Sequence, residues 1–408
     1  MGLMRSGVVT GLFLAIVLLG VTAGYVAHMR GNFHRLKAKM DTERQDAPVP
    51  RPGGEDAIVL VRSLLMGDAR PEFLSATLLP GRGMNVLQIT AYIPGRGEVN
   101  LLASPALETA TKAMTGTGAD ANGQTSLTLG SPFEVPWADG IWGTTTATGH
   151  IASAWRAHAL NLPDRGSGVA TSGLLLASAA DSVNTTTLPD GGGAQAIYNA
   201  NDFGGRWPSK TVVTVNVLLN SRSIELTVRA RNAGDVAEPI GIGWRPLFAI
   251  LDGDRQRLKL HVPGQMRVET SDKENGLPTG RLVPVTNTPY DFNATDGASL
   301  ATTDLNACFG ALHENMLDDG PAAELSDPVD HYGLRITALS SSIKAMCVTA
   351  PANGDYVSIE PQFNYPDPFG REWGKEPDTG MVVLQPGEST EWKVRLELVS
   401  PTRSDSEM

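Results

Sequence analysis

Cysteine is scarce in this sequence of 408 residues, which contains only Cys308 and Cys347. Two cysteines exclude a disulfide-dense scaffold, and their separation excludes the C-x-x-C spacing of a zinc or thiol-redox motif. One disulfide and two free thiols both remain open. Clusters of basic residues are also missing, and the formal net charge is -11. Nucleic-acid phosphates require the opposite charge, so we expect no nucleic-acid partner.

Charged residues are few, at 19%, whereas the chain contains 44 glycines and 27 prolines. Average proteins contain about 25% charged residues, about 7% glycine and about 5% proline. Short apolar runs between such turn-forming residues are typical of β proteins. The composition therefore favours a turn-rich β protein over a helical bundle.

A long uncharged run occupies Val8 to Ala27. At about 1.5 Å per helical residue it matches a hydrocarbon core about 30 Å thick. We expect residues 1–30 to form a transmembrane helix that anchors the chain in a membrane. A cleavable signal peptide is the alternative, because Arg5 precedes the run and Val21-Thr22-Ala23 resembles a cleavage site.

Two features of the sequence favour opposite orientations of this anchor in the membrane. Most flanking basic residues follow the run, and the positive-inside rule alone would keep the rest of the chain in the cytoplasm. Long domains, however, cross membranes largely regardless of charge. We therefore expect a membrane-anchored protein whose domain is periplasmic or otherwise extracytoplasmic.

The remainder of the chain divides into three parts. Residues 31–56 contain a charged stretch and a Pro/Gly-rich stretch that cannot continue a helix, so we expect a linker. Residues 57–400 are expected to form one folded domain, and residues 401–408 a disordered tail. Alternating apolar and polar residues are clearest in Ser223–Arg231 and Glu391–Leu398. This period of two predicts half-buried antiparallel strands.

Further predicted strands share the same short, turn-bounded pattern: Val86–Ile93, Thr211–Leu219, His331–Leu339, Ile343–Thr349 and Tyr356–Glu360. No alternation of strands with helices is visible, which argues against a parallel sheet. The pattern predicts an all-β domain, a large antiparallel β-sandwich or a barrel.

Several segments, taken in order, resemble the aldose 1-epimerase (galactose mutarotase) family. They are Pro239–Phe248, Leu277–Gly280, Val283–Phe292, Leu305–Phe309, Ile359–Gln362 and Leu384–Glu388, with a looser match over Pro132–Gly143 and Gly149–Trp155. The resemblance covers roughly residues 85–398. It implies the family's β-supersandwich and the interconversion of sugar anomers without metal or cofactor.

The resemblance implies that Glu360 is the catalytic base, since mutarotation needs one group to take the anomeric proton and another to protonate the ring oxygen. The family's acid is a histidine, and Arg245 stands at that position. Arginine does not release a proton near neutral pH, but its planar guanidinium stabilises a developing alkoxide or binds an anionic group. By resemblance, His150 matches a sugar-binding histidine and is the candidate substitute acid.

Other residues of the resemblance are candidates for substrate binding. Asn306 stands where the family has a sugar-binding aspartate, unless Asp304 takes that role after a local shift. Gln362 follows the proposed base, and Trp244 offers an aromatic face for a sugar ring. The family's Asn-Arg pair is Asp139-Gly140 here, which removes an arginine that holds substrate. The resemblance also brings the strands of Cys308 and Cys347 near each other, which makes a disulfide one of two alternatives.

These observations predict a carbohydrate-active isomerase that acts on a free sugar or sugar derivative. A non-catalytic carbohydrate-binding module on the same scaffold is the alternative, because the family's histidine is replaced. A structural envelope protein with no sugar affinity is a third hypothesis.

Overall fold

The computed structural model describes residues 50–400 apart from 63–69, 165–167, 272–275, 295, 301–302, 315–317 and 375–377. The predicted transmembrane helix or signal (residues 1–30), most of the predicted linker and the predicted tail (401–408) lie outside the described residues. Within the described part, no helix is long and apolar enough to cross a membrane.

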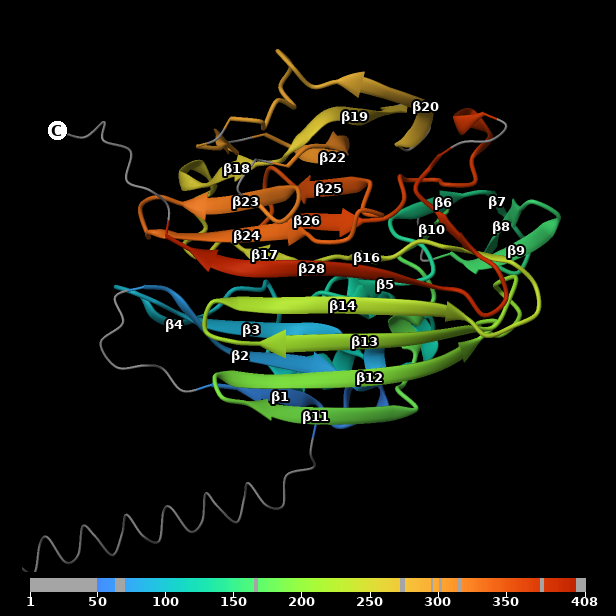
Figure 1. Ribbon diagram of the computed structural model, residues 1–408, viewed down its shortest axis with the longest axis horizontal. Helices are drawn as coiled ribbons and strands as arrows, with labels where there is room; N and C mark the ends of the chain where they lie inside the picture. Colours follow the sequence, from blue (N-terminus) through green and yellow to red (C-terminus); the bar gives the residue numbers. More distant parts are fainter. Residues whose placement is uncertain are drawn as a thin grey trace, which may run out of the picture. The chain divides into compact units, whose positions relative to one another are not determined.

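The described residues form an all-β fold with two large antiparallel sheets, which confirms the predicted all-β, antiparallel class of the folded domain (Figure 1). The first sheet has nine strands, in the order β11 (Ser182–Leu188), β12 (Gly191–Asn201), β13 (Thr211–Leu219), β14 (Ser223–Asn232), β28 (Ser389–Val399), β24 (Tyr332–Ala338), β23 (Ala322–Asp327), β18 (Lys259–His261) and β21 (Ala298–Ser299).

The second large sheet has eight strands and contains several of the segments of the family resemblance, among them Leu305–Phe309 and Ile359–Gln362. Its order is β20 (Leu277–Pro284), β19 (Gly264–Ser271), β22 (Leu305–Leu312), β25 (Ala345–Ala350), β26 (Tyr356–Gln362), β16 (Gly243–Trp244) and β5 (Phe133–Glu134), with β17 (Phe248–Ala249) paired to β26.

Smaller sheets and short helices complete the described structure. The sheets are β1 (Ile58–Val61), β2 (Glu72–Leu79), β3 (Asn85–Ile93) and β4 (Gly97–Asn100); β7 (Thr144–Thr145), β8 (His150–Trp155) and β9 (His158–Pro163); β10 (Val169–Thr171) and β6 (Gly140–Trp142); and β15 (Glu238–Ile240) and β27 (Val382–Leu384). The α-helix is α2 (Leu107–Ala113), and the 3-10 helices are η1 (Pro52–Gly54), η2 (Pro80–Arg82), η3 (Gly118–Asp120), η4 (Gln124–Leu127), η5 (Leu175–Ala177), η6 (Arg255–Arg257) and η8 (Arg371–Trp373).

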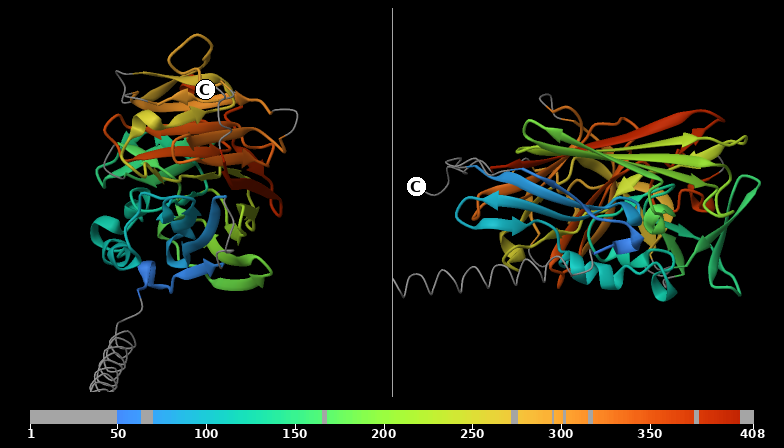
Figure 2. Two further views of the ribbon diagram at one scale, coloured as in Figure 1. Left: turned by 90° about the vertical axis from the view of Figure 1, so that its left-hand side faces the viewer. Right: turned by 90° about the horizontal axis from the view of Figure 1, so that it is seen from below.

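One large hydrophobic core joins these sheets. It takes alternate side chains of β13, β14 and β28 from the nine-stranded sheet, of β22, β25 and β26 from the eight-stranded sheet, and of β2 and β3 from the four-stranded sheet. The view from below shows β1–β4 as a layer that crosses the strands of the nine-stranded sheet (Figure 2). The alternation predicted for β14 and β28 is the alternation of their burial, so the sequence period sets which face enters the core.

The folded unit begins at Pro50, ahead of the predicted start at Ala57. Pro52 is buried, and the Gly53 N–H donates to the Met114 carbonyl. The end of the predicted linker therefore packs on the domain.

Candidate functional site

Three neighbouring strands of the eight-stranded sheet, β26, β16 and β5, carry the candidate site. Gly243 of β16 pairs with Gln362 of β26 on one side and with Glu134 of β5 on the other. Residues directly opposite one another in an antiparallel pair have side chains on the same face. Glu134 and Gln362 therefore flank Gly243, and a Cβ at position 243 would lie 3.2 Å from a Glu134 carboxylate oxygen.

The period of two along β26 separates core residues from site residues. Val357 and Ile359 enter the main core. Ser358, Glu360 and Gln362 consequently lie on the opposite face, which is the face of Glu134. The Ser358 hydroxyl donates to Glu360 Oε1 at 3.0 Å and fixes the orientation of this carboxylate.

Arg245 lies next to the predicted base. Its Nη1 is 3.4 Å from Glu360 Oε1, and the arginine side chain is 25% exposed whereas the glutamate is buried. The same period of two explains this placement, because Gly243 and Arg245 share the site face and Trp244 points the other way. The Arg245 backbone N–H donates to the Pro132 carbonyl, which ties the arginine to the segment before β5.

Burial changes the proton affinity of the carboxyl groups around this guanidinium. Burial raises the pKa of Glu360 to about 8; the Arg245 charge opposes this shift, and the charges of Glu134 and Asp139 add to it. Burial also raises the pKa of Glu134 and the pKa of Asp139. The neutral form of a carboxyl group is favoured where water is excluded. The centre therefore retains protons near neutral pH that exposed carboxyl groups would have released.

The loop after β5 completes this side of the centre. The Asp139 backbone N–H donates to Glu134 Oε2 at 3.2 Å, and Asp139 has a φ of 60°. Asn364, just after β26, accepts from the Ala138 N–H and donates to the Ala138 carbonyl. These two backbone hydrogen bonds lock the loop after β5 to the end of β26.

The loop that follows Glu360 and β26 carries a further buried carboxyl group. Asp367 has a φ of 49° and is buried; it accepts a hydrogen bond from the Trp142 N–H at 3.0 Å. Burial, with the Glu372 charge, raises the pKa of Asp367 to about 8. Trp373 stacks on Tyr365 instead of covering Glu360 directly. The loop thus adds another protonated carboxyl group to this region.

The structure brings Gln362 and Asn306 to the face of Glu360. Gln362 is buried, its Nε2 donates to the Asn364 carbonyl at 2.7 Å, and its Oε1 has no partner among the described residues. Asn306 is exposed on β22 and pairs with Thr349, which in turn pairs with Ser358. Its side chain is therefore on the site face, two strands from β26.

Asp304 and His150 are not joined to the Arg245–Glu360 pair by any hydrogen bond or ion pair that the described residues make. Asp304 Oδ1 accepts from the Ala352 N–H and so holds the turn after β25. His150 begins β8 in the separate three-stranded sheet, and its Nδ1 is 3.2 Å from the Thr148 hydroxyl in its own hairpin. The substrate role of Asp304 and the catalytic role of His150 stay predictions without a contact to support them.

Trp244 is a correction to the sequence analysis. Its indole is fully buried, packs edge-on against Phe248 and donates from Nε1 to the Ser131 carbonyl. It belongs to the main core on the face opposite Glu360. Trp244 is one residue away from Gly243 and from Arg245, which face the site. Its ring therefore points to the other side of the sheet and cannot contact a sugar at the site.

Sequence reasoning missed Glu134, which the structure places at the centre of the site. The signal was a single carboxylate in an otherwise apolar stretch, Pro132-Phe133-Glu134-Val135-Pro136. A charged side chain inside such a stretch is seldom fully buried unless it is paired or functional. Its place beside β16, however, depends on a pairing between distant segments that no local pattern reveals.

Cys308 and Cys347 form a disulfide, so the first of the two alternatives is correct. The two residues are directly opposite each other on β22 and β25, and Cys347 is in turn opposite Glu360. The bridge therefore lies on the site face beside the proposed base. Gln362 Nε2 is 4.0 Å from Cys308 Sγ.

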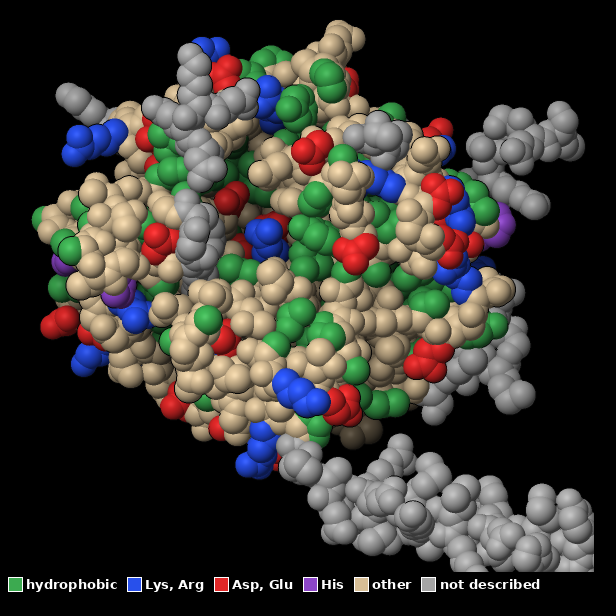
Figure 3. All heavy atoms as spheres, turned by 180° about the vertical axis from the view of Figure 1, so that it is seen from behind, with side chains coloured by type: hydrophobic (Ala, Val, Ile, Leu, Met, Phe, Trp, Pro, Cys, Tyr) green, Lys and Arg blue, Asp and Glu red, His purple; other side chains and the backbone are tan. Residues whose placement is uncertain are grey.

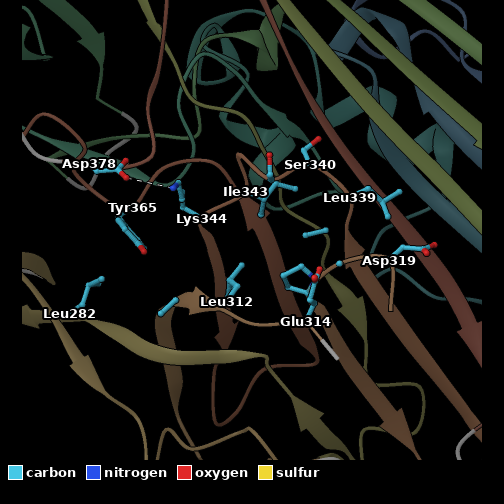
Figure 4. A pocket seen from close by; sticks show the side chains of 15 residues that line it. Leu282, Leu312, Glu314, Asp319, Leu339, Ser340, Ile343, Lys344, Tyr365 and Asp378 are labelled. Carbon is cyan, nitrogen blue, oxygen red and sulfur yellow. Dashed lines mark ion pairs between the residues drawn. The ribbon is translucent and has the colours of Figure 1, made fainter. Parts of the chain in front are cut away.

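A cavity of about 650 Å³ lies elsewhere, at the ends of β22 and β25 (Figure 4). Figure 4 shows Lys344 and Asp378 at one side, where they form an ion pair of 3.5 Å, with Tyr365 beside them. None of the residues that carry the acid–base chemistry lines it. Seen from behind, the molecule also has a central hollow with acidic and basic side chains at its bottom (Figure 3). Among the described residues, no group of His, Cys, Asp and Glu is arranged to hold a metal ion.

Solved structures of other proteins have the same fold as this chain. Structural similarity is high to a galactose mutarotase-like protein from Clostridium acetobutylicum (TM-score 0.65, 14% identity, covering 84% of this chain and 98% of that one). A GalM/aldose epimerase homologue from C. elegans gives a TM-score of 0.61 at 14% identity over 84% and 99% of the two chains. A protein from Synechocystis gives 0.61 at 15% identity over 87% and 99%. At such identities these likenesses establish the fold.

Sequence comparison establishes the family. A search of the curated proteins finds no match. The family model for aldose 1-epimerase matches residues 185–397, which is more than half of the 408 residues and includes Arg245, Asn306 and Glu360. The chain therefore belongs to the aldose 1-epimerase family.

Proposed function

We propose that this protein binds a free sugar or sugar derivative over β26, β16 and β5 and interconverts its anomers, with Glu360 as the base. The observation that carries the proposal is the Arg245–Glu360 pair at 3.4 Å, in which a buried carboxylate with a raised pKa adjoins a partly exposed guanidinium. A base with a pKa near the working pH is suited to proton transfer.

The mechanism does not require Arg245 to release a proton. Glu360 takes the proton of the anomeric hydroxyl, the anomeric carbon–oxygen bond becomes a carbonyl, and the bond to the ring oxygen breaks. The ring oxygen then carries a negative charge, which the guanidinium stabilises. After rotation about the neighbouring carbon–carbon bond, this oxygen attacks the other face of the carbonyl. Glu360 returns its proton to the anomeric oxygen, which gives the other anomer and restores the carboxylate.

Two further side chains are placed to hold hydroxyl groups. Gln362 offers an Oε1 acceptor with no partner among the described residues, and Asn306 offers an exposed amide on the same face. A buried acceptor without a partner is costly unless a ligand or water satisfies it. Sugar hydroxyls supply the matching donors.

A carbohydrate-binding module without catalysis is the second candidate. The ion pair of Glu360 with Arg245 favours it, since a carboxylate held by a guanidinium is a weaker base. This candidate predicts sugar affinity without faster anomer exchange.

The test is the rate of anomer exchange of α-glucose and α-galactose, followed by polarimetry or NMR, for the full chain and its Glu360→Gln variant. We expect acceleration that increases with pH up to about 8 and is lost in the variant. Glu238→Gln is the matched control, because Glu238 is also a buried glutamate, and it is hydrogen-bonded to Thr211. Sugar binding without acceleration would select the binding module, and no binding of any sugar would contradict both candidates.

We also propose that the domain works in an extracytoplasmic, oxidising compartment. The Cys308–Cys347 disulfide supports this location, because structural disulfides are rare where glutathione keeps thiols reduced. Thiol labelling of the denatured protein, taken from cells without reduction, should find both cysteines blocked. Free thiols at both positions would contradict the location.

A further inference from the structure

Glu134 occupies an unusual position in the site. It is fully buried on β5, and its carboxylate extends toward the space that a side chain at Gly243 would fill. On the other side of Gly243 is Gln362, two residues along β26 from Glu360. Only the narrow strand β16, bare at Gly243, separates the two glutamates.

The two glutamates act on the same guanidinium. Arg245 lies 3.4 Å from Glu360, and the charges of Glu134 and Asp139 also stabilise its positive charge. Glu134 is held in place by the Asp139 N–H, and its Oε1 has no partner among the described residues. The charge of Glu134 therefore acts on the same guanidinium that is paired with Glu360.

The groups that face Glu360 come from each neighbouring element. They are Arg245 after β16, Glu134 on β5, Asp139 in the loop after β5, Ser358 on β26 and the Cys308–Cys347 disulfide on β22 and β25. Arg245 is the cation among these groups, and the disulfide does not titrate. The Arg245 charge lowers the pKa of Glu360, whereas the charges of Glu134 and Asp139 raise it.

The geometry points to Glu134 as a positioning residue for Glu360: its carboxylate lies across Gly243 from β26, on the face of the Arg245–Glu360 pair, and adds negative charge near the guanidinium that holds the base. The inference rests on the proposed function. Burial is the main cause of the raised pKa of Glu360 and the Glu134 charge adds to it, so without Glu134 the pKa would remain raised but lie lower. With Glu134 ionised, Glu360 binds a proton more tightly and is a stronger base toward a sugar hydroxyl.

The test is a pH titration of the full chain by carboxyl ¹³C NMR, with the Glu360 signal assigned by its loss in Glu360→Gln. Two interacting carboxyl groups titrate in two steps that belong to the pair. We expect two steps for Glu360 in the unaltered protein and a single step in Glu134→Gln, at a pH lower than the upper step by about one unit, the size expected for a charge roughly 10 Å away at intermediate dielectric.

Glu134→Gln has the shape of glutamate and keeps an acceptor for the Asp139 N–H. The kinetic readout is the pH profile of anomer exchange: the acidic limb of kcat should move to lower pH while KM stays near its original value. Glu238→Gln is the control for loss of a buried glutamate, and it should leave the two steps and the profile unchanged. Asp139→Asn is a second variant at a half-buried residue, and it should shift the upper step in the same direction.

Two results would overturn the inference: a Glu360 titration that is the same in Glu134→Gln as in the unaltered protein, or a single step already present in the unaltered protein. The titration does not depend on catalysis. Absence of anomer exchange in the unaltered protein would therefore refute the proposed function, whereas the NMR steps decide separately whether Glu134 and Glu360 titrate as a coupled pair.

Discussion

The buried base predicts an unusual dependence of stability on pH. In the folded protein the pKa of Glu360 is about 8, compared with 4.5 for an unperturbed glutamate. The folded state therefore binds this proton more tightly than the unfolded state. The stabilising contribution is fully present below the unfolded pKa and is lost as pH rises from 4.5 to about 8.

The size of this effect follows from the two values. Each pH unit between them changes the free energy of unfolding by about 1.4 kcal/mol per group, so the total for Glu360 is on the order of 5 kcal/mol. Solvent does not screen this effect appreciably, since Glu360 is only 2% exposed. Glu360→Gln mimics the protonated form, so it should remove this part of the dependence.

The assay is urea unfolding of the full chain, Glu360→Gln and Glu238→Gln at pH 5, 6, 7, 8 and 9. Burial raises the pKa of Glu238 to about 7, so the effect of Glu238 on the free energy of unfolding is lost by about pH 7, below the pH at which the effect of Glu360 is lost. Between pH 7 and 8 we expect the unaltered protein and Glu238→Gln to lose stability in parallel, and Glu360→Gln to lose less. An equal loss for all three proteins in that interval would refute the assignment of a raised pKa to Glu360.

Three further predictions concern neighbouring parts of the site. Arg245→Gln should lower kcat for anomer exchange by about 100-fold to 1,000-fold, the usual cost of removing a donor to a developing oxyanion; an unchanged kcat would exclude this role. Glucuronate should bind no better than glucose in NMR titrations, because Glu360 already occupies Arg245; a preference for the uronate would show that the guanidinium is free for an anionic ligand. Trp244→Ala should destabilise the fold by about 3–5 kcal/mol in urea unfolding, and an effect on KM without loss of stability would contradict its place in the core.

The fold was predictable because the alternation of β14 and β28 is strong and because their partners are also amphipathic. Thr211–Leu219 is the strand that was predicted, and the predicted Ser223–Arg231 and Glu391–Leu398 differ from β14 and β28 by at most two residues at either end. Strand ends depend on turns and pairing partners more than on the period. The division into several sheets rests on pairings between distant segments, which a single sequence does not specify.

The candidate site was predictable only in part. Glu360 and Arg245 were found because they belong to the segments that resemble the family, and the structure brings them to 3.4 Å. Trp244 was misassigned because a strand position one residue away points to the opposite face. Glu134 was missed because its importance arises from the pairing of β5 with β16, and Phe133-Glu134 is too short to show a period.

The central claim is that Glu360 is a base that opens a sugar ring beside Arg245. The most direct measurement is the anomer exchange of α-glucose and α-galactose by the full chain at pH 8, compared with Glu360→Gln and with Glu238→Gln. The account predicts acceleration by the unaltered protein and by Glu238→Gln, and none by Glu360→Gln. Equal acceleration by Glu360→Gln, or none by the unaltered protein, would contradict it.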